Sequence, residues 1–187
     1  MSTALKDSFE ILATVVAIVS GLVAAFQAIA EFRRSIDQRR EDLRWKRAEM
    51  AKTCVDDIRR DPLSRAALTM LDWTGLSYEN PGGGRTGQID HVQRRHALRA
   101  TDTKFAVGDD GPFIRFAFDA LFDGFERLEH LIRIGLIEID DVVPPFRYYV
   151  SKLAGTEERA TMTAFLKAYE FDLALQFLDR FSAWRVI

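Results

Sequence analysis

The sequence predicts an all-α protein in which an N-terminal transmembrane helix continues into a basic stalk helix, followed by an irregular cytosolic helical bundle. Three observations support this fold class. Residues 11–30 contain no charged side chain, and residues 33–60 contain neither glycine nor proline. In the rest of the chain, apolar side chains recur at intervals of three and four, which is the spacing of an amphipathic helix. No convincing run alternates between apolar and polar residues in the manner of a β-strand.

The overall composition is that of an ordinary folded protein. The chain has 187 residues, of which 48% are hydrophobic and 29% charged, values that exclude a disordered chain, a collagen and a multi-span membrane protein. One cysteine, Cys54, excludes a disulfide framework and a cysteine-based zinc site. The net charge of -2 disfavours a dedicated nucleic-acid-binding protein, so we expect no nucleic acid among its partners.

The uncharged run from Ile11 to Ala30 predicts a membrane span. Twenty helical residues rise about 30 Å, the thickness of the hydrocarbon core of a bilayer, and we place the transmembrane helix at residues 11–32. One alternative is a helix buried in a soluble core or in an oligomer. Another is a cleaved signal peptide that ends at the small-residue pattern of residues 28–30. The basic segment that follows the run disfavours export.

Charges on either side of the run predict its orientation. Residues 33–47 carry seven basic and three acidic side chains, whereas residues 1–10 carry one basic and two acidic ones. Basic side chains close to a span are retained in the cytoplasm. We therefore expect a short outward-facing N-terminus at residues 1–10. Everything after the span is expected to be cytoplasmic, in a single-pass protein of the bacterial inner membrane.

Residues in and beside the span predict its contacts. Arg33 and Arg34 follow it directly and are expected to meet the headgroups of the lipid bilayer. Small side chains recur at every fourth position of the span, on one face where a second helix can approach closely: Ala13, Ala17, Gly21 and Ala25. The pattern predicts a homo-oligomer formed through the span. The simpler interpretation is that membrane-spanning helices are generally rich in alanine and glycine.

The juxtamembrane stalk helix is predicted over residues 33–60. Three aliphatic or thioether side chains lie seven residues apart, the spacing of a coiled coil: Ile36, Leu43 and Met50. Arg40 and Arg47 occupy the positions between them, so the seam is weak. We expect it to dimerise only where the span already holds two copies together and thereby raises their effective concentration.

The cytosolic helical domain is predicted over residues 61–187, and its 15 basic and 19 acidic side chains give it a charge opposite to that of the stalk. The expected elements are helices at 63–73, 88–100, 113–135, 146–153 and 157–184, loops at 79–84 and 101–112, and a break at Pro144 and Pro145. The helix at 113–135 has the strongest periodicity. Its stripe comprises Ile114, Phe118, Leu121, Phe125, Leu128 and Ile132, widened by Phe113, Phe116 and Phe122.

One cluster of basic residues is the candidate ligand site. It lies in the loops and short helix at 79–112 and consists of Arg85, His91, Arg94, Arg95 and Arg99. Guanidinium groups bind phosphate oxygens in pairs, so the cluster predicts a phosphate-bearing ligand; the simpler interpretation is a solvated basic helix. The preceding glycines do not form a phosphate loop, because Gly87 is followed by glutamine and isoleucine rather than by lysine and a hydroxyl residue.

No other pattern predicts chemistry. His91 and His96 are five residues apart and point about 140° away from each other on a helix, which disfavours a shared metal ion. Asp119 and Asp123 lie on one helix face, where we expect them to pair with arginines of the same helix. The sequence therefore predicts no catalytic residue, no metal site and no cofactor.

Two largely hydrophobic segments follow the predicted span and stalk: ALTMLDWTGLSYE at residues 67–79 and FDALFDGFERLEHLIRIGLIEIDD at residues 118–141. With these segments in this order, the chain resembles a loose group of bacterial single-span inner-membrane proteins of unknown function. The resemblance covers most of the chain. It implies an N-terminal span, a basic stalk and a helical cytosolic domain, and it implies neither an activity nor a catalytic residue.

These features predict a membrane-anchored, non-enzymatic interaction or signalling protein that oligomerises through its span and binds an unknown cytosolic protein partner. A more specific version is a stress or phage-defence effector whose oligomerisation disturbs the membrane. The alternative is a small ligand-binding or enzymatic helical domain that recognises a phosphate-bearing ligand at the loops of residues 79–112.

Overall fold

The computed structural model of the chain describes the backbone of residues 3–72, 76–79, 86–100, 110–153 and 156–184. It describes the side chains of the same residues except 3–19, 76–79, 86–88, 156–158 and 184. The chain divides into two compact units, Met1–Lys46 and Arg47–Ile187, and each unit is considered by itself.

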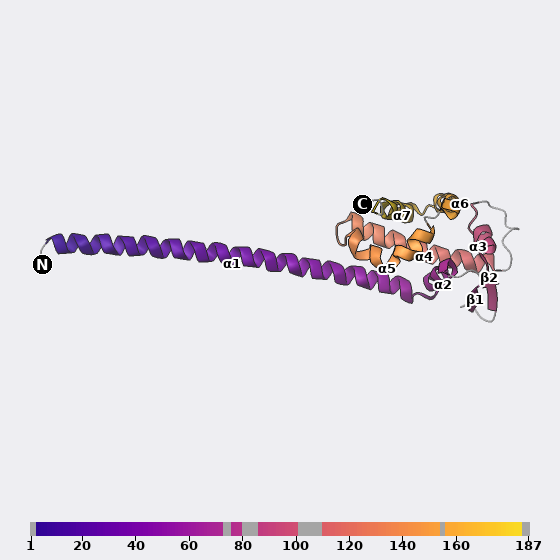
Figure 1. Cartoon of the computed structure of the whole chain (residues 1–187), viewed down its shortest axis with the longest axis horizontal. Helices are drawn as coiled ribbons and strands as arrows, with labels where there is room; N and C mark the ends of the chain where they lie inside the picture. The colour runs from indigo at the N-terminus through magenta and orange to yellow at the C-terminus, as the bar shows by residue number, and fades with distance from the viewer. Residues whose placement is uncertain (1–2, 73–75, 80–85, 101–109, 154–155, 185–187) are drawn as a thin grey trace. The chain divides into compact units, whose positions relative to one another are not determined.

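The described residues contain seven helices and one short β-hairpin (Figure 1). In chain order they are α1 (Thr3–Arg60), α2 (Pro62–Asp72), β1 (Leu76–Glu79), β2 (Thr86–Ile89), α3 (His91–Ala97), α4 (Gly111–Arg133), α5 (Ile139–Leu153), α6 (Thr156–Ala168) and α7 (Asp172–Trp184). The predicted all-α class is thus confirmed in its main feature. The hairpin is an addition, in which β1 and β2 pair antiparallel with Leu76 opposite Ile89.

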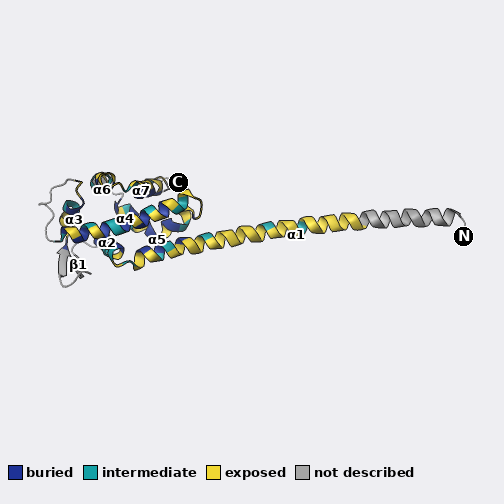
Figure 2. Cartoon of the chain, turned by 180° about the vertical axis from the view of Figure 1, so that it is seen from behind, coloured by how far each residue is buried: buried dark blue, intermediate teal, exposed yellow. Residues whose placement is uncertain are grey.

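The first unit consists of the part of α1 that ends at Lys46. α1 has no interruption from Thr3 to Arg60, as predicted for the span and the stalk together. From Ser20 onward, nearly all side chains of this unit are exposed (Figure 2). Within the part of the chain whose side chains the structure describes, no helix is long and apolar enough to cross a membrane. Residues 11–19 of the predicted span lie outside that description, and the span stays a prediction.

The second unit begins earlier than the sequence predicted. Its first element is the end of α1, from Arg47 to Arg60, and there Ala51, Val55 and Ile58 are buried in the hydrophobic core. The structure therefore places the boundary before Arg47 rather than after residue 60. The apolar residues of this segment recur at helical spacing, which indicates an apolar face. The spacing does not indicate that the rest of the domain covers that face.

The end of α1 approaches α4 closely at Gly124. A Cβ atom at this position would lie 2.8 Å from Cγ1 and 3.0 Å from Cδ1 of Ile58, which is closer than van der Waals contact. Glycine inside a helix costs about 1 kcal/mol relative to alanine, and here the missing side chain makes room for Ile58. Near the start of the second unit, Arg47 forms an ion pair with Glu138, which directly precedes α5.

α4 is the central helix of the second unit and packs against α2, α3 and α7. The predicted stripe is confirmed, because its members Ile114, Phe118, Leu121, Phe125 and Leu128 are all buried. The ring of Phe122 lies 6.1 Å from that of Phe165 and 5.6 Å from that of Phe171, so aromatic contacts join α4 to α6 and to the turn after it. Phe116, which the sequence assigned to the stripe, is 63% exposed.

α5 continues through Pro144 and Pro145, where the sequence predicted a break. Each proline removes one backbone hydrogen bond of the helix. On the same turns, however, Val142, Val143 and Phe146 are fully buried. The apolar surface that these three side chains remove from water offsets the lost hydrogen bonds, which explains why the helix is not interrupted.

The predicted last helix is two helices, α6 and α7, separated by a turn at Glu170. The backbone of Glu170 has a φ of 61°. Its N–H group donates to the carbonyl of Lys167 at 3.5 Å, and that of Phe171 donates to the carbonyl of Leu166 at 2.9 Å. This hydrogen-bond pattern ends many helices and usually has glycine at the residue with positive φ. Both helices have apolar residues at helical spacing, so periodicity alone does not reveal the turn.

Replacement of Glu170 by glycine is expected to raise the free energy of unfolding by about 1 kcal/mol, because positive φ strains every residue with a Cβ atom. Urea unfolding followed by circular dichroism measures the change. The matched control is the end of α4, where the same pattern has Gly135 at a φ of 74°. Gly135→Ala is expected to lower stability by a similar amount, and an unchanged stability in both variants would contradict the strain argument.

Candidate functional site

The structure distributes the predicted basic cluster over different environments. Arg94, on α3, is buried and donates a hydrogen bond from Nη1 to the carbonyl of Met70 on α2. Arg95 is half-buried, whereas His91 and Arg99 are exposed. The remaining member, residue 85, lies outside the described residues.

The start of α3 is held by reciprocal hydrogen bonds. The carboxylate of Asp90 accepts from the backbone N–H of Gln93 at 2.7 Å, and the side-chain oxygen of Gln93 accepts from the backbone N–H of Asp90 at 2.9 Å. Such a capping box satisfies two donors that the first turn of a helix leaves open. It defines where α3 begins and thereby which of its side chains, Arg94 among them, face α2.

Arg94 and Arg95 meet at a small cavity between α3 and α6. Leu98, Thr161 and Met162 complete its lining, and its volume is about 10 Å³. A cavity of this size holds about one water molecule, so a phosphate group fits only if the lining residues move apart. Within its described part, the structure thus brings two members of the predicted cluster to one cavity. The phosphate site itself stays a prediction.

Arg115, near the start of α4, ties together three segments. Its Nε donates to the carbonyl of Ala97 at 2.7 Å, and its Nη2 donates to the carbonyl of Arg99 at 3.3 Å. Its Nη1 donates to the hydroxyl of Tyr169 at 3.0 Å, and the guanidinium carbon lies 5.6 Å from the centre of the same ring. A cation is favourable at the carbonyl end of a helix, so Arg115 stabilises the end of α3. These hydrogen bonds to α3 and to Tyr169 come in addition to the expected electrostatic interaction of Arg115 with Asp119 on the same helix.

The carboxyl group of Asp119, one turn beyond Arg115, has a pKa raised to about 6 from 3.8. The main cause is burial, which disfavours the charged form, and the carboxylate of Asp123 raises the pKa further. The positive charge of Arg115 acts in the opposite direction and lowers the pKa.

Among the described residues, no group of histidine, cysteine, aspartate and glutamate side chains is arranged to hold a metal ion.

Asp119→Asn is expected to stabilise the protein at neutral pH but not in acid. Because the pKa of Asp119 is higher in the folded than in the unfolded state, its ionisation lowers stability as the pH rises from about 4 to about 6. The variant should match the wild type below pH 4 and exceed it by about 1 kcal/mol above pH 6, after allowance for solvent screening. Urea unfolding across this pH range measures the difference. Asp123→Asn removes only the smaller of the two causes that raise the pKa of Asp119, so it should increase stability less. A stability difference between Asp119→Asn and the wild type that does not change with pH would contradict the raised pKa of Asp119.

Two glutamates of α4 hold α7 in place. Glu129 is fully buried, and its two carboxylate oxygens accept hydrogen bonds from Nε and Nη2 of Arg180 at 3.0 Å and 2.6 Å. Glu126 accepts from the backbone N–H of Leu173 at 3.1 Å, in the first turn of α7, where a negative charge is favourable. Glu129 was not among the residues predicted from the sequence. The feature that indicates it is its position four residues after Phe125, on the apolar face of the helix.

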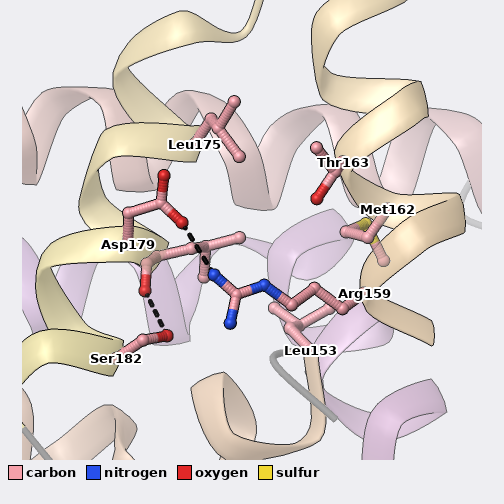
Figure 3. Close-up of a pocket in the computed structure, with 8 residues that line it drawn as sticks. Leu153, Arg159, Met162, Thr163, Leu175, Asp179 and Ser182 are labelled. Carbon is pink, nitrogen blue, oxygen red and sulfur yellow. Dashed lines mark hydrogen bonds and ion pairs between the residues drawn. The ribbon is translucent and has the colours of Figure 1, made fainter. Parts of the chain in front are cut away.

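A second small cavity lies between α6 and α7 (Figure 3). Its apolar lining consists of Leu153, Met162, Leu175 and Leu178, and its volume is about 10 Å³. Arg159 of α6 and Asp179 of α7 form an ion pair of 3.0 Å at its edge, with both side chains about half exposed. This cavity also has room for only about one water molecule. The ion pair at its edge joins α6 to α7.

The residues predicted to act in the membrane lie on α1. Arg33 and Arg34 are exposed, as are Gly21 and Ala25. A Cβ atom at Gly21 would meet no other atom within 4 Å. The side chains of the other two members of the small-residue face, at positions 13 and 17, lie outside the described residues, and both predictions stay untested.

No family model, curated protein or solved structure matches the chain. The fold and the contacts given above define the class of protein: a predominantly α-helical chain whose second unit is a bundle centred on α4.

Proposed function

We propose that the protein is a membrane-anchored interaction or signalling protein without enzymatic activity. Residues 11–32 cross the membrane once, and the chain after them is cytoplasmic. The observation that carries the proposal is the uncharged run from Ile11 to Ala30, which is followed by Arg33 and Arg34 within the same helix. An apolar run of this length followed by arginines is typical of a span whose C-terminal side faces the cytoplasm.

Exposed apolar side chains of α1 support this anchor. Several large ones between Ser20 and Arg33 are at least half exposed: Leu22, Val23, Phe26, Ile29 and Phe32. Exposed apolar surface of this extent is costly in water. In a bilayer, lipid chains cover this apolar surface on all faces of the helix, and no protein partner is needed.

The second unit supports the role of an interaction domain. It has a hydrophobic core of its own, which includes Phe118, Phe122 and Phe125 of α4, and it therefore presents a folded surface to the cytoplasm. In this proposal the anchor keeps that surface near the membrane, where copies that share the membrane meet each other at raised effective concentration.

Membrane fractionation of the full-length protein in a bacterial host tests the anchor. We expect the wild type to remain with the membranes after an alkaline wash, and to require detergent for extraction. A variant with Leu22→Arg and Val23→Arg should be lost from the membranes, because each arginine at mid-span costs about 3 kcal/mol. The matched control has Ser35→Arg and Gln38→Arg, outside the span, and should stay bound.

Recovery of the wild type in the soluble fraction without detergent would contradict the anchor. Orientation is tested separately with a C-terminal tag in spheroplasts. The tag should be protected from added protease until the membrane is broken, and digestion in intact spheroplasts would contradict the proposed orientation.

A further inference from the structure

The first unit carries aliphatic side chains at a strict interval of seven residues: Leu22, Ile29, Ile36 and Leu43. We call them the heptad row. Leu22, Ile29 and Leu43 are between 54% and 65% exposed, and Ile36 is half-buried. In the polar stretch from residue 33 to residue 46, the row supplies the only two aliphatic residues. These two continue the phase of the two in the apolar stretch.

The interval itself indicates what covers the row. A straight α-helix drifts by about 20° for every seven residues, so a row with a strict seven-residue interval follows a left-handed path around the helix. That path is the contact line between helices that wind around each other. A lipid environment covers all faces of a helix alike and requires no such row, so the interval points to another helix.

We propose that the heptad row is the seam of a parallel pair formed by two copies of this chain. The proposal rests on the proposed membrane anchor. Copies anchored in one membrane with one orientation hold identical residues at the same depth, so the row of one copy faces the same row of the other. Arg39 and Lys46 lie three residues after Ile36 and Leu43, close to this seam, where like charges oppose pairing. Tethering in the membrane compensates for this repulsion.

The heptad row differs from the small-residue face of the span. Gly21 is about 100° around the helix from Leu22, and Ala25 is about 60° away on the same side. A small-residue face favours a right-handed crossing confined to the span, whereas the heptad row extends the contact beyond Arg34. The two faces therefore predict different contacts in the stretch from residue 35 to residue 46.

Disulfide cross-linking of full-length protein in membranes tests the seam. In a Cys54→Ser background, Ile36→Cys and Leu43→Cys are expected to give covalent dimers on oxidation, because disulfides form only where Cα atoms approach within about 7 Å. The matched controls are Gln38→Cys and Trp45→Cys. They lie two residues further along, about 200° around the helix, and should give no dimer.

A non-covalent readout uses Leu43→Asp, which should abolish the dimer measured by photobleaching in detergent, with Trp45→Asp as the control that retains it. Equal cross-linking at row and control positions overturns the proposed pair. Absence of cross-linking at all of these positions, in protein that sediments with membranes, overturns it as well. Neither result affects the proposed anchor. Protein that stays soluble but cross-links only at the row supports the pair and overturns the anchor. Cross-linking at Gly21→Cys but not at the row positions assigns the contact to the small-residue face and overturns the proposal.

Discussion

Arg180→Ala is expected to lower the free energy of unfolding by about 3 kcal/mol, because it leaves the carboxylate of Glu129 buried without its cation. Glu129 has no exposed surface and receives two hydrogen bonds from the guanidinium group. The side chain of Arg180 is 44% exposed, so water reaches one side of the pair and reduces the loss below that of a fully buried pair. Urea unfolding of the full-length protein at pH 7 measures it.

The matched control for this prediction is Arg159→Ala. Its partner Asp179 is 58% exposed, and the pair also joins two helices, with an N–O distance of 3.0 Å. An exposed pair contributes about 0.5 kcal/mol. A further variant, Glu129→Leu with Arg180→Leu, should recover most of the stability lost in Arg180→Ala, because it removes the buried charge together with its partner. Equal losses for Arg180→Ala and Arg159→Ala would contradict a special role for the buried carboxylate.

Removal of residues 1–60 is expected to unfold the second unit, whereas removal of residues 1–46 is expected to leave it folded. The difference is the segment from Arg47 to Arg60, which fills the core with Ala51, Val55 and Ile58. Loss of two large buried aliphatic side chains and the helix that carries them costs about 5 kcal/mol or more, which is comparable to the total stability of a small domain. Circular dichroism and thermal unfolding of the two fragments measure the effect.

Substitutions in the full-length chain separate this effect from that of truncation. Val55→Ala with Ile58→Ala should destabilise the second unit by about 3 kcal/mol. Lys52→Ala with Thr53→Ala changes exposed residues of the same turns and should have an effect within about 0.5 kcal/mol. Cooperative unfolding of the 61–187 fragment at the temperature of the 47–187 fragment would show that the end of α1 is not part of the core.

The elements with one continuous apolar stripe were predictable. The buried face of α4 follows from the intervals between Ile114, Phe118 and Phe125, and its end at Arg133 follows from Gly135, whose φ of 74° favours glycine. The break between α6 and α7 was not predictable, because it uses Glu170 at a position where glycine is usual. Nor was the continuity of α5, because tertiary burial outweighs the two prolines.

The candidate site was less predictable than the fold. The sequence showed that residues 85–99 are rich in arginine, but the burial of Arg94 depends on the carbonyl of Met70, in another helix. Arg115 was expected to interact with carboxylates on its own helix, and it does act on Asp119. Its hydrogen bonds to the end of α3 and to Tyr169 were not predicted. In each case the partner is distant in sequence, and spacing along one helix carries no information about it.

The sequence by itself determined that the chain is helical, that α1 is one long helix, and which face of α4 is buried. The buried face of α4 follows from apolar residues at helical spacing, and the continuity of α1 follows from the absence of glycine and proline between residues 33 and 60. Both are local properties of the chain. Only the tertiary structure decided that the second unit starts at Arg47 and that Glu129 is a buried charge. The physical reason is that the end of α1 contacts α4 at Gly124, and that the partner of Glu129 lies 51 residues away, on α7. A helical pattern identifies the surface that must be buried, and packing between distant segments determines what buries it.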